Sequence, residues 1–342
     1  MTNSSTKPSG KHISSEDELR AIIPNYPKML DKRILPALDK YCLEIINHSS
    51  LTVFACSDPS HSIRLLRSSA ISILDNHTIE LGIGLEVSAD KTELPVPSKP
   101  VFASLYFLVP GIGHGLRVNG SLNLESLAVS LKVKGAYVHC ARAAARSELW
   151  APAPFNSQFN DKTRFSHDHF LKHSSFLLLK TMNSEGQTEL SPRGDQPGFV
   201  QQLGNHQLFI PERPGNKVAI SLRNILQNSS IELLMIVPGS SNILIVKGHA
   251  KLINDDALLE AAAVKNKRPK LGILIEECEF TLQQSKALSE PKLWQGRSRT
   301  HPRQLTNFPK VLAAHMNGEG LLGKATTPVV KAIVRHDMNN LY

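Results

Sequence analysis

Two segments in the second half of the chain bring glycine, proline and charged residues together in a way that suits ligand binding. The segment SPRGDQPGFV runs from Ser191 to Val200, between two apolar runs that read as strands. It holds two prolines, two glycines, an arginine and an aspartate, whereas a tight turn needs only one glycine or proline. This surplus indicates a backbone that is shaped around a bound molecule.

The segment PERPGNKVAISLRNILQN, over residues 211–228, combines a turn with a predicted helix. Gly215 and Asn216 can adopt backbone angles that aim N–H groups inward. Lys217 supplies a positive charge, and Ser221 supplies a hydroxyl group one turn further on. The amino-terminal end of a helix adds partial positive charge. Together these features suit a phosphate group.

Two arginines extend this candidate phosphate site. Arg223 lies in the same predicted helix, whose apolar residues Ile220, Ile225 and Leu226 recur at helical spacing. Arg193 can reach the same ligand from the neighbouring predicted strand. The alternative is a pair of ordinary proline-glycine turns with Arg and Lys at the surface, and Arg223 could equally pair with an acidic neighbour.

The segments that must position these residues are mostly predicted strands. Short apolar runs alternate with Gly and Pro turns, and VPGIGHG and VPGSSN are typical of hairpin connections. A predicted helix precedes the strands in each half, over residues 27–46 and 163–173. Ile34, Leu38 and Cys42 mark the expected buried face of the first helix. Several antiparallel strands with one or two helices in about 130 residues indicate a small barrel.

The chain also repeats itself, because three pairs of similar segments occur in the same order. The pairs are residues 47–58 and 172–183, residues 105–120 and 233–248, and residues 141–150 and 285–294. We therefore expect two copies of one domain. The predicted organisation is a disordered lead-in over 1–17, a first domain over 18–152 and a second domain over 153–342 with a C-terminal helical tail.

Composition excludes several classes of protein. The chain has 342 residues and a formal net charge of +9, and no apolar run approaches the ~18 residues of a membrane span. The first residues lack the apolar region of a secretory signal. Basic residues are spread out without an interleaved aromatic stripe, so nucleic acid is not expected as a partner. The four cysteines form no C-x-x-C pair, which suits a reducing compartment and a cytoplasmic protein.

The second half is similar to the flavin-binding split-barrel superfamily of pyridoxamine 5'-phosphate oxidase. It resembles the bacterial branch that carries S-P-R-G-D-x-P-G-F, a D/E-R-P-G-N turn and S-L-R-N-I-L. These motifs stand here at Ser191–Phe199, Glu212–Asn216 and Ser221–Leu226. The resemblance implies a mainly β fold of two tandem six-stranded antiparallel split barrels. It also implies FMN at the interface of paired barrels, one holding the phosphate and ribityl chain while the other covers part of the ring.

The resemblance assigns FMN-binding roles to one set of residues in the second domain. Arg193 and Lys217 become the contacts of the phosphate or ribityl chain. The full set is Ser191, Pro192, Arg193, Gly194, Asp195, Ile210, Pro211, Arg213, Gly215, Asn216, Lys217, Ser221 and Arg223.

The first domain lacks both phosphate segments but keeps a sequence like the closing segment of the family, GAYVHCARAAARSELWAP over residues 135–152. In the second domain that segment has drifted to TLQQSKALSEPKLWQG. We therefore expect a pseudo-dimer with a single FMN, which His139, Arg142, Arg146 and Trp150 would face. The alternative is that the helix with Arg142 and Arg146 only buttresses the domain interface, with Trp150 in the core.

The function implied is an FMN-dependent oxidoreductase that acts on a small-molecule redox substrate. The flavin would carry the redox chemistry, and no side chain is singled out as a catalytic acid or base. One alternative is a haem-binding or haem-degrading split barrel, with His139 or His315 as candidate ligands. Another is an interaction module without turnover, with or without flavin. No metal site is predicted, and a further homodimer is compatible with each alternative.

Overall fold

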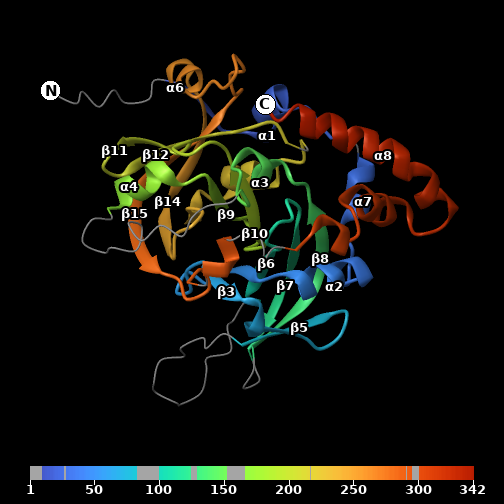
Figure 1. Ribbon diagram of the computed structural model, residues 1–342. Helices are drawn as coiled ribbons and strands as arrows, with labels where there is room; N and C mark the ends of the chain where they lie inside the picture. Colours follow the sequence, from blue (N-terminus) through green and yellow to red (C-terminus); the bar gives the residue numbers. More distant parts are fainter. Residues whose placement is uncertain are drawn as a thin grey trace, which may run out of the picture.

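The computed structural model describes residues 10–26, 28–82, 100–124, 129–151, 166–215, 217–289, 291–294 and 300–342. These residues form two antiparallel β-sheets that lie side by side, with helices around their edges (Figure 1). The predicted mainly β fold class is therefore confirmed. Within the described residues, no helix is both long and apolar enough to cross a membrane.

The first sheet comes from the first half of the chain and has the strand order β3-β2-β6-β7-β8-β5-β4. Its strands are β2 (Leu51–Cys56), β3 (Arg64–Arg67), β4 (Ile71–Ile73), β5 (Thr78–Leu81), β6 (Phe102–Leu108), β7 (Gly115–Asn123) and β8 (Val129–His139). The second sheet has the order β10-β9-β13-β14-β15-β12-β11. Its strands are β9 (Phe176–Met182), β10 (Thr188–Gly194), β11 (Gln201–Gly204), β12 (Gln207–Pro211), β13 (Ser230–Ile236), β14 (Asn242–Asn254) and β15 (Gly272–Gln284).

The two sheets have the same topology, strand for strand. The β6–β7 hairpin of the first sheet corresponds in position to the β13–β14 hairpin of the second, and these hairpins hold the similar sequences noted above. Each path contains seven strands where six were predicted. The additional short strands lie at the sheet edges, such as β4 and β11, and carry no apolar run that sequence reading could detect.

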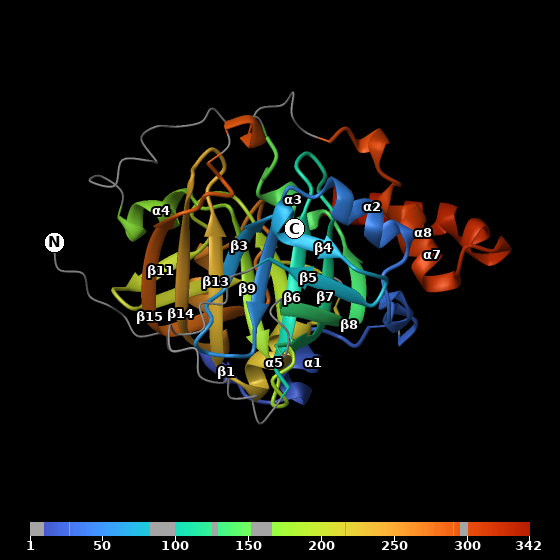
Figure 2. The ribbon, with the colours of Figure 1, turned by 90° about the horizontal axis from the view of Figure 1, so that it is seen from below.

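The sheets pack face to face through their central strands, which are buried on both sides. In β9, Leu177 and Leu179 belong to the core of the second sheet, whereas Phe176 and Leu178 face a cluster shared with the first sheet. β2 alternates in the same way, because side chains of a strand point to opposite faces. This double burial explains why both strands read as unbroken apolar runs. Figure 2 shows the two sheets side by side with these strands between them.

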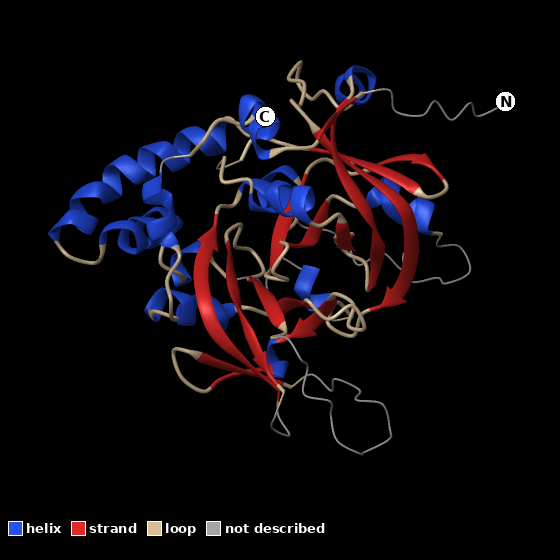
Figure 3. Ribbon diagram, turned by 180° about the vertical axis from the view of Figure 1, so that it is seen from behind, coloured by secondary structure: helices blue, strands red, loops and turns tan. Residues whose placement is uncertain are grey.

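The helices occupy the ends and edges of the sheets (Figure 3). They are α1 (Glu16–Ile22), α2 (Lys40–His48), α3 (Arg142–Arg146), α4 (His167–His173), α5 (Ile220–Gln227), α6 (Asp256–Ala261), α7 (Phe308–Asn317) and α8 (Leu321–Asn339). Short 3-10 turns cover η1 (Lys28–Arg33), η2 (Ser68–Ala70), η4 (Pro291–Trp294) and η6 (Pro302–Gln304).

The helix predicted over 27–46 is split into η1 and α2. Pro36 lies between the two elements and cannot donate the backbone hydrogen bond that a continuous helix needs. Leu38 and Cys42 are buried as predicted, whereas Ile34 is 38% exposed. The helices expected near residues 163–173 and 220–226 are confirmed as α4 and α5.

Each end of the described chain packs on the sheet formed by the other half: the N-terminal end packs on the second sheet, and the segment near the C-terminal end packs on the first sheet. Strand β1 (Lys11–Ile13) pairs with β14 of the second sheet, and Ile13 and Leu19 are buried in the core of that sheet. Leu305 and Val311, near and within α7, are buried in the core of the first sheet.

This exchange corrects two sequence predictions. Residues 10–17 of the predicted disordered lead-in form a strand and the start of a helix, because β14 offers a partner strand that local sequence does not reveal; residues 1–9 lie outside the described part. The helical tail assigned to the second domain packs on the first sheet.

Candidate functional site

A cavity of about 530 Å³ lies between the two halves of the molecule. One wall comes from the first half, through the end of β8 and α3. The opposite wall comes from β10, from residues 211–215 and 217–221, and from residues 267–271 of the second half. Residues 22–24 and Tyr342 also line the cavity, as do Arg33, Arg117 and Phe199, so both ends of the described chain reach it.

The two walls meet where β10 crosses α3, and this crossing requires glycine. A Cβ atom built on Gly194 would lie 2.1 Å from the carbonyl oxygen of Ala143 and 3.1 Å from the Cβ atom of Ser147. The first distance is too short for any other side chain without movement of the backbone, and the second is tighter than most Cβ contacts. One glycine of SPRGDQPGFV therefore serves the contact between the halves, which the sequence prediction had attributed to a ligand.

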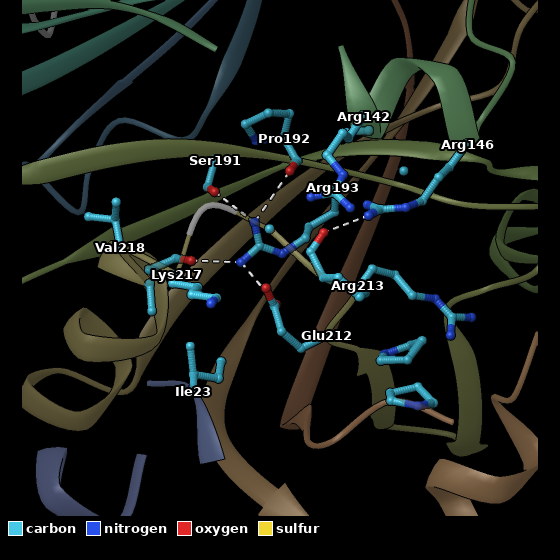
Figure 4. Close-up of a pocket in the computed structure, with 18 of the residues that line it drawn as sticks. Ile23, Arg142, Arg146, Ser191, Pro192, Arg193, Glu212, Arg213, Lys217 and Val218 are labelled. Carbon is cyan, nitrogen blue, oxygen red and sulfur yellow. Dashed lines mark hydrogen bonds and ion pairs between the residues drawn. The ribbon is translucent and has the colours of Figure 1, made fainter. Parts of the chain in front are cut away.

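Arg193 lines the cavity and is held by neutral and charged partners (Figure 4). Its guanidinium group donates to the hydroxyl oxygens of Ser191 and Ser221, both at 2.7 Å. It also forms an ion pair with the carboxylate of Glu212 at 3.1 Å. These contacts fix the orientation of the guanidinium group, while its Nε atom is buried without a partner among the described residues.

Asp195 lies behind the cavity wall and holds two of the residues that form it, Arg213 and Tyr342. Its side chain is 1% exposed, forms an ion pair with Arg213 and accepts a hydrogen bond of 2.6 Å from the hydroxyl group of Tyr342. Burial and the bond to Asp195 raise the pKa of the Tyr342 phenol to about 12. The ring of Tyr342 lies 5.4 Å from the guanidinium carbon of Arg213, a cation–π distance. Asp195 thus positions two lining residues and does not line the cavity itself.

The turn before α5 has a backbone shape that is unusual for its residues. Lys217 and Ala219 have φ angles of 62° and 55°, in the left-handed region that favours glycine. Ala219 is the N-cap residue of α5, and no side chain of the described residues caps that end. The first N–H groups of a helix lack intrahelical partners. At the edge of this cavity they are available to a ligand.

Arg142 and Arg146 project from α3 as a pair of buried cations (Figure 4). They are 8% and 6% exposed, and their hydrogen bonds go to main-chain carbonyl oxygens: Asn340 at 2.6 Å for Arg142, and Leu341 at 2.7 Å with Pro214 at 2.6 Å for Arg146. Burial and the adjacent Arg142 lower the pKa of Arg146 to about 10. The carbonyl oxygens of residues 340 and 341 thus contact both arginines, and the carboxylate of Asp337 lies 3.9 Å from Arg142.

His139 lies at the end of β8 between two tyrosine rings, with ring centroids 5.4 Å from Tyr106 and 4.9 Å from Tyr137. Burial and then the charge of Arg117 lower the pKa of His139 well below its usual value, so the imidazole is neutral. Its Nε2 atom is buried without a partner among the described residues. His139 therefore lines the cavity with a neutral ring whose Nε2 atom is buried.

Behind His139, a buried polar cluster joins the two sheets. Glu189 of β10 pairs with Arg117 and Asn119 of β7, and it accepts a hydrogen bond of 2.7 Å from the hydroxyl group of Tyr137. Burial raises the pKa of Glu189 and lowers that of Arg117 to about 10, although each group attracts the other. The cluster fixes β10 against the first sheet two residues before the motif begins.

Twelve of the seventeen sequence-predicted residues line the cavity, four described residues do not, and one lies outside the described residues. Those that line it are Ser191, Pro192, Arg193, Gly194, Pro211, Arg213, Gly215, Lys217, Ser221, His139, Arg142 and Arg146. Asp195 acts from behind, as described, and Asn216 lies outside the described residues. Ile210 is fully buried in the core of the second sheet, because its strand position points inward.

The predictions for Arg223 and Trp150 are not supported by their positions. Arg223 lies outside the lining, and its guanidinium group is 3.9 Å from the carboxylate of Glu16 on the exchanged N-terminal segment, as the alternative interpretation anticipated. Trp150 packs against the cluster between the sheets and donates to the carbonyl oxygen of Ile112 at 2.9 Å. His315 also lies outside the lining of the cavity.

Sequence reasoning missed Arg33, Arg117 and Tyr342 in the lining. The sequence could have indicated Arg117, because this charged residue stands between the buried residues Leu116 and Val118 in a strand that is followed by another apolar strand. Tyr342 had no such signal, because its place depends on the path of the C-terminal helices, which local sequence does not reveal.

No known family profile matches this chain, and no curated protein does. Solved structures match it in part. HupZ of Group A Streptococcus is 17% identical over 32% of this chain and 86% of its own, with a TM-score of 0.28. A structure described as a putative pyridoxamine 5'-phosphate oxidase from Lactobacillus delbrueckii is 18% identical over 35% of this chain and 94% of its own, with a TM-score of 0.27. A protein of the pyridoxinephosphate oxidase family from Clostridium acetobutylicum is 10% identical over 39% of this chain and 99% of its own, with a TM-score of 0.25.

Proposed function

We propose that this protein binds one FMN in the cavity between its two halves and acts as an oxidoreductase on a small-molecule substrate. The observation that carries the proposal is the composite lining. The residues of the phosphate-type motifs and those of the closing segment, which stand in different halves of the sequence, line one cavity.

The phosphate end of the cofactor fits the turn before α5. There the uncapped helix end, the left-handed Lys217 and the hydroxyl group of Ser221 lie together at the cavity wall. Helix ends and turns of this kind bind anions through main-chain N–H groups. Arg193 supplies a cation, but Glu212 already offsets part of its charge. We therefore assign the main charge contact to Lys217.

The remainder of the cavity suits a planar ring with polar edges. Ile22, Ile23 and Phe199 give apolar surface. The buried Nε atoms of Arg142 and Arg193 and Nε2 of His139 have no partners among the described residues, and buried polar atoms are normally paired. A bound flavin would supply the redox chemistry. The protein's residues would orient it, exclude water and offer hydrogen bonds to its edge.

Tandem duplication and a pseudo-dimer belong to the same proposal. The identical strand order of the two sheets supports duplication. The alternating burial of β2 and β9 supports a face-to-face pairing of the copies. With one set of phosphate residues and one closing segment, such a pair has one complete site.

The experiment is a flavin titration of the purified full chain, followed by flavin fluorescence and by absorbance near ~450 nm. We expect one FMN per chain, and Lys217→Ala should weaken FMN binding about ten- to a hundred-fold, because a charge-assisted contact contributes roughly 1.5–3 kcal/mol. Arg193→Ala should weaken it in the same direction. Binding of riboflavin, which lacks the phosphate, should not change in Lys217→Ala.

The matched control is Arg64→Ala, since Arg64 is outside the lining and stands in the first-half stretch equivalent to the motif. Two FMN per chain would refute the single composite site. Unchanged FMN affinity in both Lys217→Ala and Arg193→Ala would refute the phosphate assignment.

Haem is the second candidate, and His139 is the observation that favours it. A neutral imidazole with an unused Nε2 atom is a suitable iron ligand. Absorbance near ~410 nm in place of ~450 nm, lost in His139→Ala, would decide for haem.

A further inference from the structure

A second cluster of functional side chains lies away from the cavity, where α2 of the first half meets α7 near the end of the chain. It consists of Asp39, Cys42 and His315, which none of the cavity-lining elements contains. One ligand-type atom from each residue lies within 4.8 Å of the others. Residues far apart in the sequence thus converge on one small volume.

The carboxylate of Asp39 is already oriented by its neighbours. As N-cap of α2, it accepts a hydrogen bond of 2.8 Å from the backbone N–H of Cys42 through Oδ1. Its Oδ2 atom faces Nε2 of His315 at 3.0 Å. A carboxylate held by an outer hydrogen bond on one oxygen keeps the other in place for a ligand or ion.

The thiol of Cys42 distinguishes this cluster from an ordinary aspartate–histidine ion pair. Such a pair needs only Asp39 and His315, yet the sulfur atom completes a set of one oxygen, one nitrogen and one sulfur. Sulfur and imidazole ligands select against Ca²⁺ and Mg²⁺, which bind oxygen, and favour Zn²⁺.

Burial of the cluster is one-sided. Cys42 is fully buried and His315 is 7% exposed, whereas the side chain of Asp39 is 31% exposed. Two ligands would be shielded, and the partly exposed Asp39 is the side from which a water molecule would come as a fourth ligand. Zinc sites with three protein ligands and one water are a common arrangement.

We propose that Asp39, Cys42 and His315 form a Zn²⁺ site that joins the C-terminal helices to the first sheet. On binding, the Cys42 thiol would release its proton to solvent and become the thiolate ligand, with no change of oxidation state. The ion pair of Lys40 with Glu319, at 2.6 Å, joins the start of α2 to the connection between α7 and α8. The proposed zinc site goes beyond the sequence-based expectation, which contained no metal, and it is independent of flavin binding.

The test is a Co²⁺ titration of the full chain after treatment with a chelator, because Co²⁺ in a zinc site reports its ligands by colour. We expect one Co²⁺ per chain, visible bands of tetrahedral Co²⁺, and a near-ultraviolet thiolate-to-cobalt band that Zn²⁺ removes. Zn²⁺ should also raise the Tm. Cys42→Ser should abolish the thiolate band and weaken binding at least tenfold, and His315→Gln should weaken binding similarly.

Cys278→Ser is the matched control, because Cys278 is also buried but belongs to the core of the second sheet. It should leave the cobalt spectrum unchanged. If Cys42→Ser does not fold, Asp39→Asn keeps an oxygen to cap α2 and should still weaken binding. A wild-type chain that binds no Co²⁺, or binds it without a thiolate band as exposed histidines of α4 would, overturns the proposal.

Discussion

The buried ion pair of Arg117 and Glu189 crosses from one sheet to the other, so removing one partner should reveal how firmly the halves are joined. Both side chains are almost fully buried, at 3% and 6% exposure. In Glu189→Leu the guanidinium group of Arg117 would stay buried without its counter-charge. Breaking a buried pair in this way costs about 3–5 kcal/mol of the free energy of unfolding.

The double variant Arg117→Met/Glu189→Leu should recover most of that loss. Burial shifts both pKa values toward the neutral forms, in spite of the mutual attraction. Burial thus opposes the charged form of each group, and replacement of a buried ion pair by apolar residues of similar size is often neutral. We expect the double variant to be more stable than either single variant.

Urea unfolding of the wild type, both single variants and the double variant gives a complete cycle. Intrinsic tryptophan fluorescence reports the interface directly, since Trp150 and Trp294 lie in the cluster between the sheets. Strictly additive losses, or a loss below about 1 kcal/mol in Glu189→Leu, would refute the reasoning.

Two further predictions concern pH and packing. Burial lowers the pKa of His114 to about 4, so the unfolded chain takes up a proton between pH 6.5 and 4 that the folded chain does not. As the pH falls from 6.5 to 4, the free energy of unfolding should therefore decrease, and His114 accounts for at most about 3 kcal/mol of this decrease. The variant His114→Gln should lack that part of the decrease. His77→Gln, which changes a histidine at an exposed turn, should keep it. Gly194→Ala should destabilise the fold by about 1–3 kcal/mol and weaken flavin binding, because its Cβ would meet the backbone of α3. Gly204→Ala, where a Cβ meets nothing within 4 Å, should be tolerated when both are compared by urea unfolding.

Much of this architecture could be predicted from the sequence because local sequence patterns determine it. The apolar runs of β2, β6, β9 and β13 and the turns between them identify the strands, and the repeated order of segments identifies two equivalent sheets. The short edge strands were not predicted, because three or four residues are too few to show a hydrophobic periodicity.

The site was predictable where a motif stays within one segment and unpredictable where distant segments meet. Lys217 and Ser221 line the cavity as the helix-end pattern indicated. The sequence around Trp150 is compatible both with a ligand-facing residue of the closing segment and with a core residue, and only the packing in the structure distinguishes these two interpretations. The contact of Asp39 with His315 and the arrival of Tyr342 beside Asp195 depend on long-range paths, which local patterns do not encode.

The exchanged ends have a consequence for how the chain is made. Strand β1 is synthesised long before its partner β14, and the first sheet is complete before α7, which covers it, has been translated. The first half cannot reach its final packing until α7 has been made, and β1 has no partner strand until β14 has been made. The same interlock means that a chain cut once between the halves would still hold together as a two-piece molecule. Its folding should therefore be slow and late, as contacts between distant segments require, and its assembled form should resist separation into two independent barrels.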